Sequence, residues 1–437
     1  MSGTPAVGFT AALRLPRYPY MWVSGALWHT SRWGMAFLAA YFARSLSESP
    51  RLVQLTGVAM WMPLLLGGVL GGVVSDRFDR RRTLLVQLTG LIPLVFLVGI
   101  LVHLDQMRLW MIYPFMVFVG IGWVVDMTSR RAYIFDLVGP ERIDNAMALE
   151  SFGMAIGMIS GTLFGGSAIE AIGVGSAFLG VGGLLLLSLL LFSRVPASAA
   201  IHAPVRADSA ERTSARVALA QMRDGFGLLG RYPGLVSILG ITATVNFFYF
   251  AHVPLVQVIG KQLGAGASRV GVLAAMTGTG MMISSLIIGR GRITGRGRAY
   301  CVGSMFAFAF LIVAAQANSY PLALVSLLAA GIGTGFFGST QSTLVMTSVP
   351  IEVRGRALGL LSTAIGVLPL GMLGLGELAE AYGTATAITV SCSLGAALSV
   401  LWLVRHPEVL RMTSDARPPA LGATVTIESP TPAPAQA

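Results

Sequence analysis

Long apolar runs recur along the chain between residues 20 and 404, and charged residues fall mostly between them. Each run has roughly the 20 residues that a helix needs to cross about 30 Å of hydrocarbon. Because lipid offers no partners for backbone polar groups, such runs indicate helices. The pattern predicts an all-α membrane protein with twelve transmembrane helices, at residues 20–43, 54–75, 83–104, 109–128, 145–168, 175–193, 234–257, 269–289, 299–317, 321–345, 357–379 and 384–404.

Composition supports a membrane protein and changes how the charge is interpreted. The 437 residues are 54% hydrophobic and 11% charged, which excludes two or three soluble domains. A net charge of +11 on a soluble protein would suggest nucleic-acid binding. Here most Lys and Arg residues fall on one side of the membrane if both termini are cytoplasmic, so the charge reflects topology. The near absence of lysine beside many arginines suggests a GC-rich bacterial genome. We therefore expect a multi-pass protein of a bacterial cytoplasmic (inner) membrane, with lipid neighbours and no nucleic-acid partner.

A polar stretch rich in Pro, Ala and Ser divides the predicted helices into six and six. We expect a cytoplasmic amino terminus at 1–19, helical bundles at 20–193 and 234–405, a cytoplasmic linker at 194–233 and a disordered cytoplasmic tail at 406–437. A weak internal repeat, in which Ala146 to Leu149 matches Ala357 to Leu360, suggests two pseudo-symmetric halves. Repeated halves around a midplane cavity are what alternating access requires.

Six charges in seven residues, from Asp76 to Arg82, follow the second predicted helix. An acid beside a Gly-rich helix end can accept hydrogen bonds from another helix's N-terminus, and neighbouring arginines can pair with acids. The simpler alternative is that this loop only anchors the helix on the cytoplasmic side.

This loop, from Gly72 to Arg81, closely resembles the loop between helices 2 and 3 of the major facilitator superfamily, Gly-x-x-x-Asp-Arg-x-Gly/Asp-Arg-Arg/Lys. Segments 129–138, 145–149 and 349–356 resemble the bacterial branch that exports drugs, siderophores and macrolides. The resemblance implies that Asp76 caps the start of helix 11 and that Arg80 pairs with Asp126 at the inner end of helix 4. The implied conformational latch comprises Gly72, Asp76, Arg77, Arg80, Asp126 and Arg130.

Helix 5 departs from the antiporters of this superfamily, because Thr162 stands where they carry Pro. The departure weakens the case for antiport. The small-residue spacing at Gly153, Gly157, Gly161 and Gly165 nevertheless predicts close contact with another helix, for which helix 8 across the pseudo-twofold is a candidate.

Ionisable residues inside predicted spans are functional candidates because they are costly to place in lipid. His29 and Arg32, beside Trp28, lie on one face of helix 1, which lines the central cavity by resemblance. Arg32 suits substrate or coupling, or a structural pair; His29 suits packing or a proton site. Glu150 is the proton-coupling candidate, and its alternative is a hydrogen bond that fixes helix 5. On helices 7 and 10 the cavity candidates are Asn246, Phe250 and Gln341.

These observations predict a proton-coupled antiporter that exports hydrophobic or amphipathic molecules, drug-like or siderophore-like, by alternating access. A lysophospholipid flippase and a non-transporting ligand sensor remain the alternatives. The chain has no Walker loop, zinc-binding His-Glu-x-x-His or Gly-x-Ser-x-Gly elbow, so we expect no enzyme activity, cofactor or metal. The partners we expect are a small lipophilic substrate and protons, and the protein is expected to be a monomer.

Overall fold

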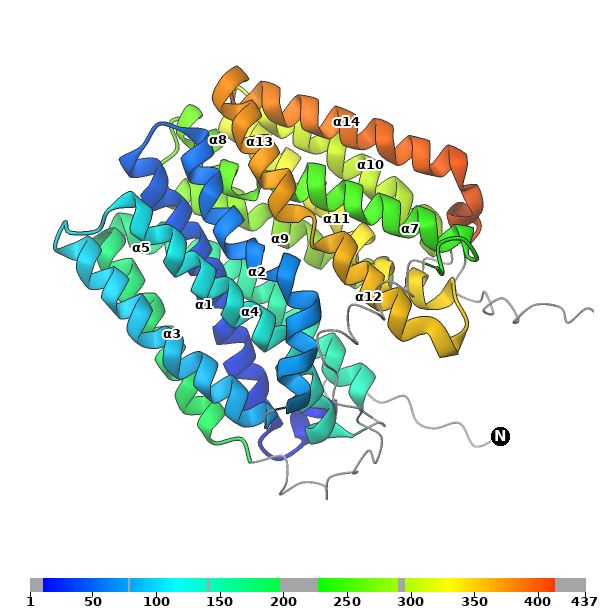
Figure 1. Ribbon diagram of the computed structural model, residues 1–437. Helices are drawn as coiled ribbons and strands as arrows, with labels where there is room; N and C mark the ends of the chain where they lie inside the picture. The colour runs from blue at the N-terminus through cyan, green and yellow to red at the C-terminus, as the bar shows by residue number, and fades with distance from the viewer. Residues whose placement is uncertain (1–10, 78, 140–141, 197–226, 290–294, 413–437) are drawn as a thin grey trace, which may run out of the picture.

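The computed structural model describes residues 11–77, 79–139, 142–196, 227–289 and 295–412, without the side chains of residues 11, 66–77, 144 and 289. Within these residues the fold is entirely helical (Figure 1). A short 3-10 turn, η1 (Ala11–Arg14), precedes the helices of the amino-terminal half. These are α1 (Tyr18–Leu46), α2 (Pro50–Arg77), α3 (Arg80–His103), α4 (Leu109–Val138) and α5 (Ile143–Ser193).

The carboxyl-terminal half contains more breaks. Its elements are α7 (Pro233–Thr244), the π-helical η3 (Val245–Tyr249), the 3-10 helix η4 (Phe250–Leu255), α8 (Val256–Gln262), α9 (Ala267–Gly289), α10 (Arg296–Ala315), α11 (Tyr320–Thr347), η5 (Ile351–Val353), α12 (Arg354–Ile365), α13 (Leu368–Tyr382), α14 (Thr384–Arg405) and η6 (Pro407–Arg411).

Nine helical segments of the described chain are long and apolar enough to cross a membrane. One of them, α5, divides at Gly173, whose φ of 80° lies in a region that favours glycine. The helices α1 and α2 are as long as the others. The described helices therefore accommodate the twelve predicted spans in two halves.

Three predicted spans differ from the structure in shape. Helix α4 continues to Val138, well beyond the predicted end at residue 128. The seventh span is interrupted by η3 and η4, where Pro254 lacks a backbone N–H and its ring crowds the preceding turn. The eleventh span is interrupted at Gly366, between α12 and α13. Interruptions of this kind in membrane helices need neighbouring helices to satisfy the freed backbone groups.

Glycines bring α5 into direct backbone contact with α1. A Cβ atom at Gly157 would lie 2.3 Å from the His29 Cβ, and one at Gly161 would lie 2.4 Å from the Thr30 carbonyl oxygen. Small residues are typical of membrane helix interfaces because they let two backbones approach. The predicted close contact of this stripe is present, and its main partner is α1 rather than helix 8.

The next glycine along α5 does face helix 8, which is α9 in the structure. A Cβ atom at Gly166 would lie 2.6 Å from the Ala267 carbonyl oxygen and 3.0 Å from the Gly271 Cα. Helix α2 likewise packs beside α13 of the other half (Figure 1). The two halves therefore meet along α2 with α13 and along α5 with α9.

Candidate transport site

The bundle has two ends, which we name by their charges. The arginine-rich end carries the start of α3 and the ends of α4 and α14; the opposite end carries the α1–α2 connection and the start of α9. Within the described residues, every hydrogen bond or ion pair that joins the two halves lies at the opposite end or near mid-membrane, as at Ser49 with Glu380 (2.6 Å) and Ser268 with Glu170 (2.6 Å). The conformation described is therefore closed at the opposite end.

Charged contacts also close this end. Lys261, at the end of α8, donates to the Glu48 carboxylate, and Arg51 lies 3.6 Å from Glu377. The hydrogen bond and charge of Lys261 hold the pKa of Glu48 below its usual range. Exposed pairs of this kind contribute little each and weaken in salt. They are therefore suited to a contact that breaks and reforms.

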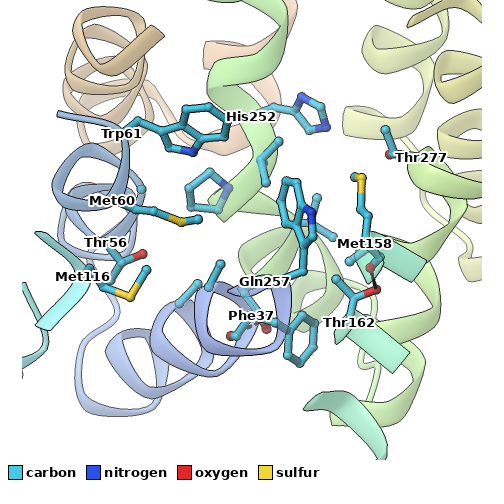
Figure 2. Close-up of a pocket in the computed structure, with 18 residues that line it drawn as sticks. Phe37, Thr56, Met60, Trp61, Met116, Met158, Thr162, His252, Gln257 and Thr277 are labelled. Atoms are coloured by element: carbon cyan, nitrogen blue, oxygen red, sulfur yellow. Dashed lines mark hydrogen bonds between the residues drawn. The ribbon is translucent and has the colours of Figure 1, made fainter. Parts of the chain in front are cut away.

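A chamber lies just inside the closed end, between the halves (Figure 2). Its walls are mainly apolar, formed by Trp, Met, Ala, Val, Phe, Pro and Gly residues, with hydroxyls of Thr and the side chains of His252 and Gln257 as polar groups. The volume is about 60 Å³, enough for a few water molecules but not for a drug-sized ligand. The labelled lining residues come from both halves and include Phe37, Met60, Trp61, Met116, Met158, Thr162 and Thr277.

Two glutamines hold the halves together beside this chamber. The Gln54 Nε2 donates to the Ala251 carbonyl oxygen at 2.5 Å, and the Gln257 Nε2 donates to the Phe37 carbonyl oxygen at 3.3 Å. The Oε1 atom of each glutamine is buried without a hydrogen-bond partner among the described residues. Each half thus donates to a backbone carbonyl of the other and keeps one unsatisfied acceptor at the interface.

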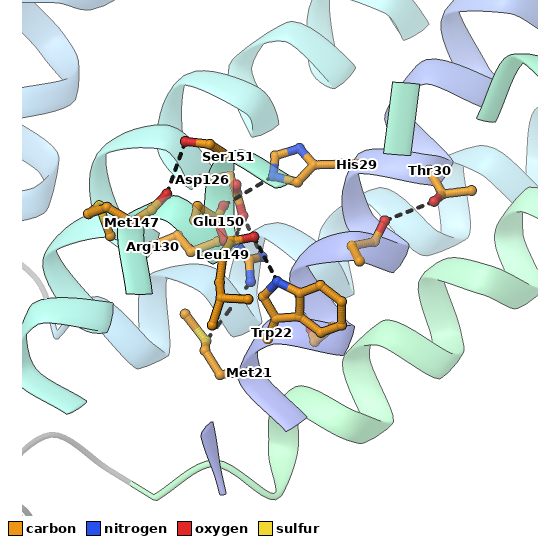
Figure 3. Close-up of polar contacts among 12 residues, drawn as sticks. Met21, Trp22, His29, Thr30, Asp126, Arg130, Met147, Leu149, Glu150 and Ser151 are labelled. Carbon is orange, nitrogen blue, oxygen red and sulfur yellow. Dashed lines mark hydrogen bonds and ion pairs between the residues drawn. The ribbon is translucent and has the colours of Figure 1, made fainter. Parts of the chain in front are cut away.

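A cluster of ionisable side chains lies in the amino-terminal half, on the arginine-rich side of the chamber (Figure 3). Its nearest member, His29, is one helical turn from the lining residue Trp33. The His29 Nε2 lies 3.1 Å from the Glu150 Oε1. Arg130 donates to the Asp126 Oδ1 from Nε (2.8 Å) and from Nη2 (2.6 Å). All four side chains belong to residues at most 7% exposed. Because buried charges are stable only when paired, the first contact holds α1 to α5, and the second neutralises two charges within α4.

Gly25 marks the place where the two pairs approach each other. A Cβ atom there would lie 3.2 Å from the Arg130 Nη1 and 3.5 Å from the Glu150 Oε2. The opposite charges of Arg130 and Glu150 also interact across this space. The two pairs therefore form one electrostatic unit rather than two separate contacts.

Arg32 extends this unit by a fifth group. Its guanidinium lies between Trp33 and Trp123, 4.7 and 4.8 Å from the ring centroids, and the residue is 1% exposed. The Nε and Nη1 atoms have no hydrogen-bond partner among the described residues, and Asp126 is the carboxylate that acts on it electrostatically. Indole faces attract a guanidinium but do not satisfy its N–H groups. Arg32 therefore retains unused donors in a buried site.

The predicted cavity residues do not line the chamber. Trp28, His29 and Arg32 lie on α1, on the arginine-rich side of the chamber. There His29 contacts α5 and Arg32 contacts α4. In the other half, Asn246 donates to the Thr242 carbonyl oxygen of its own helix, and Gln341 donates to the Thr242 hydroxyl.

Phe250 packs on two aromatic rings, with centroids 5.2 Å from that of Tyr249 and 6.3 Å from that of Phe337. In the conformation described, the three candidates of the carboxyl-terminal half are therefore packing and hydrogen-bonding groups. They are Asn246 on η3, Phe250 on η4 and Gln341 on α11.

The latch differs from the expectation at one contact. Arg80 pairs with Asp136 at 2.7 Å, whereas Asp126 pairs with Arg130 on its own helix. The prediction that Arg80 binds Asp126 was wrong because α4 continues to Val138, which places Asp136 at the helix end and Asp126 about 15 Å deeper. Gly72, Asp76 and Arg77 lie in the part of α2 whose side chains are not described. The cap that Asp76 is expected to form on helix 11, which begins with α12 in the structure, therefore stays a prediction.

Apart from Thr162, which was identified as the departure from the antiporter pattern of helix 5, sequence reasoning missed the residues that form the chamber. Thr56, Met60 and Trp61 stand in an unremarkable apolar run of α2, and nothing in the run distinguishes them. The one available signal was polarity, since Gln54 and Gln257 are amides near the ends of apolar segments.

These features define a class: a multi-pass α-helical membrane protein whose two halves meet around a central chamber. The family model described as Major Facilitator Superfamily matches residues 21–370 and, in an overlapping match, residues 238–432. The chain belongs to the Major Facilitator Superfamily of transporters, as its loop from Gly72 to Arg81 predicted.

Individual relatives are more distant. The chain is 25% identical over 375 residues to the uncharacterized MFS-type transporter YfiS of Bacillus subtilis, covering 84% of this chain and 87% of YfiS. It is 26% identical over 335 residues to the enterobactin exporter EntS of Shigella flexneri, covering 74% and 75%. A solved bacterial homologue of the human lysosomal transporter Spinster, in an inward-facing and occupied conformation, has a TM-score of 0.67 at 16% identity, covering 91% and 97%. The structural likeness supports the fold alone.

Proposed function

We propose that the chain exports hydrophobic or amphipathic small molecules across a bacterial cytoplasmic membrane by proton-coupled antiport. The observation that carries the proposal is the buried pair of His29 and Glu150, 3.1 Å apart beside Arg130. A buried carboxylate next to an imidazole offers a place for one proton, and intramembrane acids and histidines are typical of proton pathways.

Export is supported by the relatives rather than by any residue. EntS carries the name enterobactin exporter, and its similarity extends over three quarters of each chain. The chamber supports a lipophilic ligand, because Trp33, Trp61 and several methionines make an apolar, adaptable wall. The chamber must widen to admit such a ligand, and we propose that it does so when the contacts between the halves rearrange.

Alternating access then couples proton uptake by the pair to movement of the ligand. In the conformation described, contacts such as Glu48 with Lys261 close the opposite end, which we take to face outward, with both termini in the cytoplasm. We propose that protonation of the pair of His29 and Glu150 loosens α1 from α5 and thereby changes the chamber wall, which both helices contribute to.

Proteoliposomes with an internal pH dye provide the test. Lipophilic dyes, macrolides, catechol siderophores and lysolipids are added one at a time, and proton movement is recorded for wild type and for Glu150→Gln. Proton release from the protein on ligand binding, absent in Glu150→Gln, is expected. Ligand-driven transport of a lysolipid without any proton movement would instead establish the lipid flippase.

A further inference from the structure

A groove runs along the outer surface of the amino-terminal half, between α3 and α4. Its volume is about 650 Å³, and it shares no residue with the chamber. Large apolar side chains on its walls are exposed, including Val86 (64%) and Phe118 (53%). In a membrane-spanning chain such a surface contacts lipid rather than water. The remaining apolar lining consists of Gly90, Leu91, Leu94, Ile121, Gly122 and Val125.

A free positive charge stands at the arginine-rich end of the groove. Of the three consecutive arginines, Arg80 pairs with Asp136, and Arg81 donates to the carbonyl oxygens of Ser193 and Val195. The exposed guanidinium of Arg82 has no side-chain partner among the described residues, although it lines the groove. An arginine at this depth attracts lipid phosphate.

The dimensions of the groove match one lipid chain. From Arg82 to Leu94 the helix rises about 18 Å, close to the roughly 15 Å depth of one leaflet's hydrocarbon. Two polar residues line the groove between them: Thr83, whose hydroxyl donates to the Asp79 carbonyl oxygen, and Gln87. Both polar atoms of the Gln87 amide are buried without a hydrogen-bond partner among the described residues. It lies about 7 Å deeper than Arg82 along the helix, near the level of the ester groups of a phospholipid whose phosphate binds Arg82.

We propose that this groove binds one anionic phospholipid, with the phosphate on Arg82, an ester carbonyl accepting from the Gln87 amide, and an acyl chain lying on Gly90 and Leu94. Two observations carry the proposal independently: the unpartnered polar groups at two depths and the open, apolar floor. At Gly90 a Cβ atom would meet nothing within 4 Å, so the floor is empty of protein. The site does not depend on the transported substrate.

Native mass spectrometry of the full chain provides the test. Wild type and variants are equilibrated in micelles that contain equal amounts of phosphatidylglycerol and phosphatidylcholine, and retained lipids are counted. Arg82→Gln removes the phosphate contact, and Gly90→Leu fills the groove. The matched controls are Arg405→Gln, an exposed arginine at the same end, and Gly183→Leu, an exposed glycine on α5 that also has nothing within 4 Å of its Cβ position.

Wild type and both controls are expected to retain one phosphatidylglycerol in preference to phosphatidylcholine, unaffected by added inorganic phosphate. Retention should fall about fivefold in Arg82→Gln, the effect of one arginine near the membrane surface, and should be lost in Gly90→Leu. Each variant must keep the wild-type melting temperature in lipid-free detergent, which separates lipid loss from misfolding. Unchanged retention in Gly90→Leu, or displacement by inorganic phosphate, would overturn the proposal, because the groove would then not hold the lipid.

Discussion

The Glu150 carboxylate lies 3.1 Å from the His29 imidazole, so an acid on α5 and a base on α1 form one buried pair. Arg130, Asp126 and Arg32 continue the cluster with alternating charge. When His29 is neutral and Glu150 is ionised, the two arginines and two carboxylates cancel, and the formal charge of the five groups is zero. A single proton therefore changes the charge of a buried, otherwise neutral site, which is the property a coupling site needs.

The first prediction concerns the strength of this pair. His29→Ala leaves the Glu150 carboxylate buried without its nearest partner and should destabilise the protein by about 3 kcal/mol. Glu150→Gln should cost less, because the glutamine amide can still hydrogen-bond to His29 and Arg130 keeps both of its hydrogen bonds to Asp126. A double-mutant cycle, measured from reversible unfolding in detergent, should give a coupling energy above about 1 kcal/mol. Additive effects of the two substitutions would contradict a paired site.

A second prediction tests the charge balance around Arg32. Asp126→Asn leaves two buried arginines, Arg130 and Arg32, with Glu150 as the one remaining carboxylate of the cluster. The substitution should lower the free energy of unfolding by about 3 kcal/mol or more. Adding Arg32→Gln should recover part of this loss, because the formal charge returns to zero. Thermal unfolding of the single and double variants measures the effect.

The control for this prediction is Asp136→Asn. The pair of Asp136 with Arg80 is only half-buried, so its loss should cost about 1 kcal/mol or less. The charge-balance account fails if Arg32→Gln lowers stability as much in the Asp126→Asn background as in wild type.

The glycine stripe of α5 gives a third prediction with a control on the same helix. Gly161→Ala places a methyl group 2.4 Å from the Thr30 carbonyl oxygen and 2.8 Å from the Gly34 nitrogen, so α1 must move away. Overpacking of this kind costs about 1–3 kcal/mol. Gly153→Ala meets the Trp22 indole nitrogen at 3.5 Å and the Ala26 Cβ at 3.9 Å, which are ordinary contact distances, and should be tolerated. Equal melting temperatures for the two variants would show that α1 and α5 are not held at this distance.

The fourth prediction is a pH dependence of the closed end. Lys261 lowers the pKa of Glu48 below the usual 4.5, so this contact stabilises the closed end fully above that pH and is lost as the pH falls through the lowered value. Leu46 and Tyr382 are exposed positions on opposite halves at this end, where spin labels can be attached. On acidification, a larger fraction of molecules should show a long distance between the two labels.

High salt should reduce this population shift, because both groups are exposed. Glu48→Gln should remove the pH-dependent part of the change. If the distance distribution of Glu48→Gln responds to pH as wild type does, the contact with Lys261 is not the sensor.

Much of the fold was accessible from the sequence because each span is apolar over its own length. The run of charges from Asp76 to Arg82 indicated the family, since its residue types and spacing are local features. Helix ends were harder to place. A segment of mixed polar and apolar residues continues α4 to Val138, so Asp136, not Asp126, reaches Arg80.

The site depended on contacts that no local pattern encodes. His29 and Glu150 were each identified as costly residues in the membrane, but their pairing joins helices far apart in the sequence. The glycine stripe of α5 predicted close packing without specifying the partner, because small residues allow approach from any neighbour. The chamber residues are ordinary membrane residues, and only the meeting of two halves makes them a wall.

The most direct test of the central claim is proton movement in proteoliposomes with Glu150→Gln and Glu170→Gln compared. Glu170 is an acid on the same helix that bonds to Ser268 at the opposite end, so its substitution controls for removing a carboxylate. We expect ligand-driven proton movement to be lost in Glu150→Gln, with ligand binding retained, and to persist in Glu170→Gln. Undiminished proton movement in Glu150→Gln would contradict the assignment of the pair of His29 and Glu150 as the proton site.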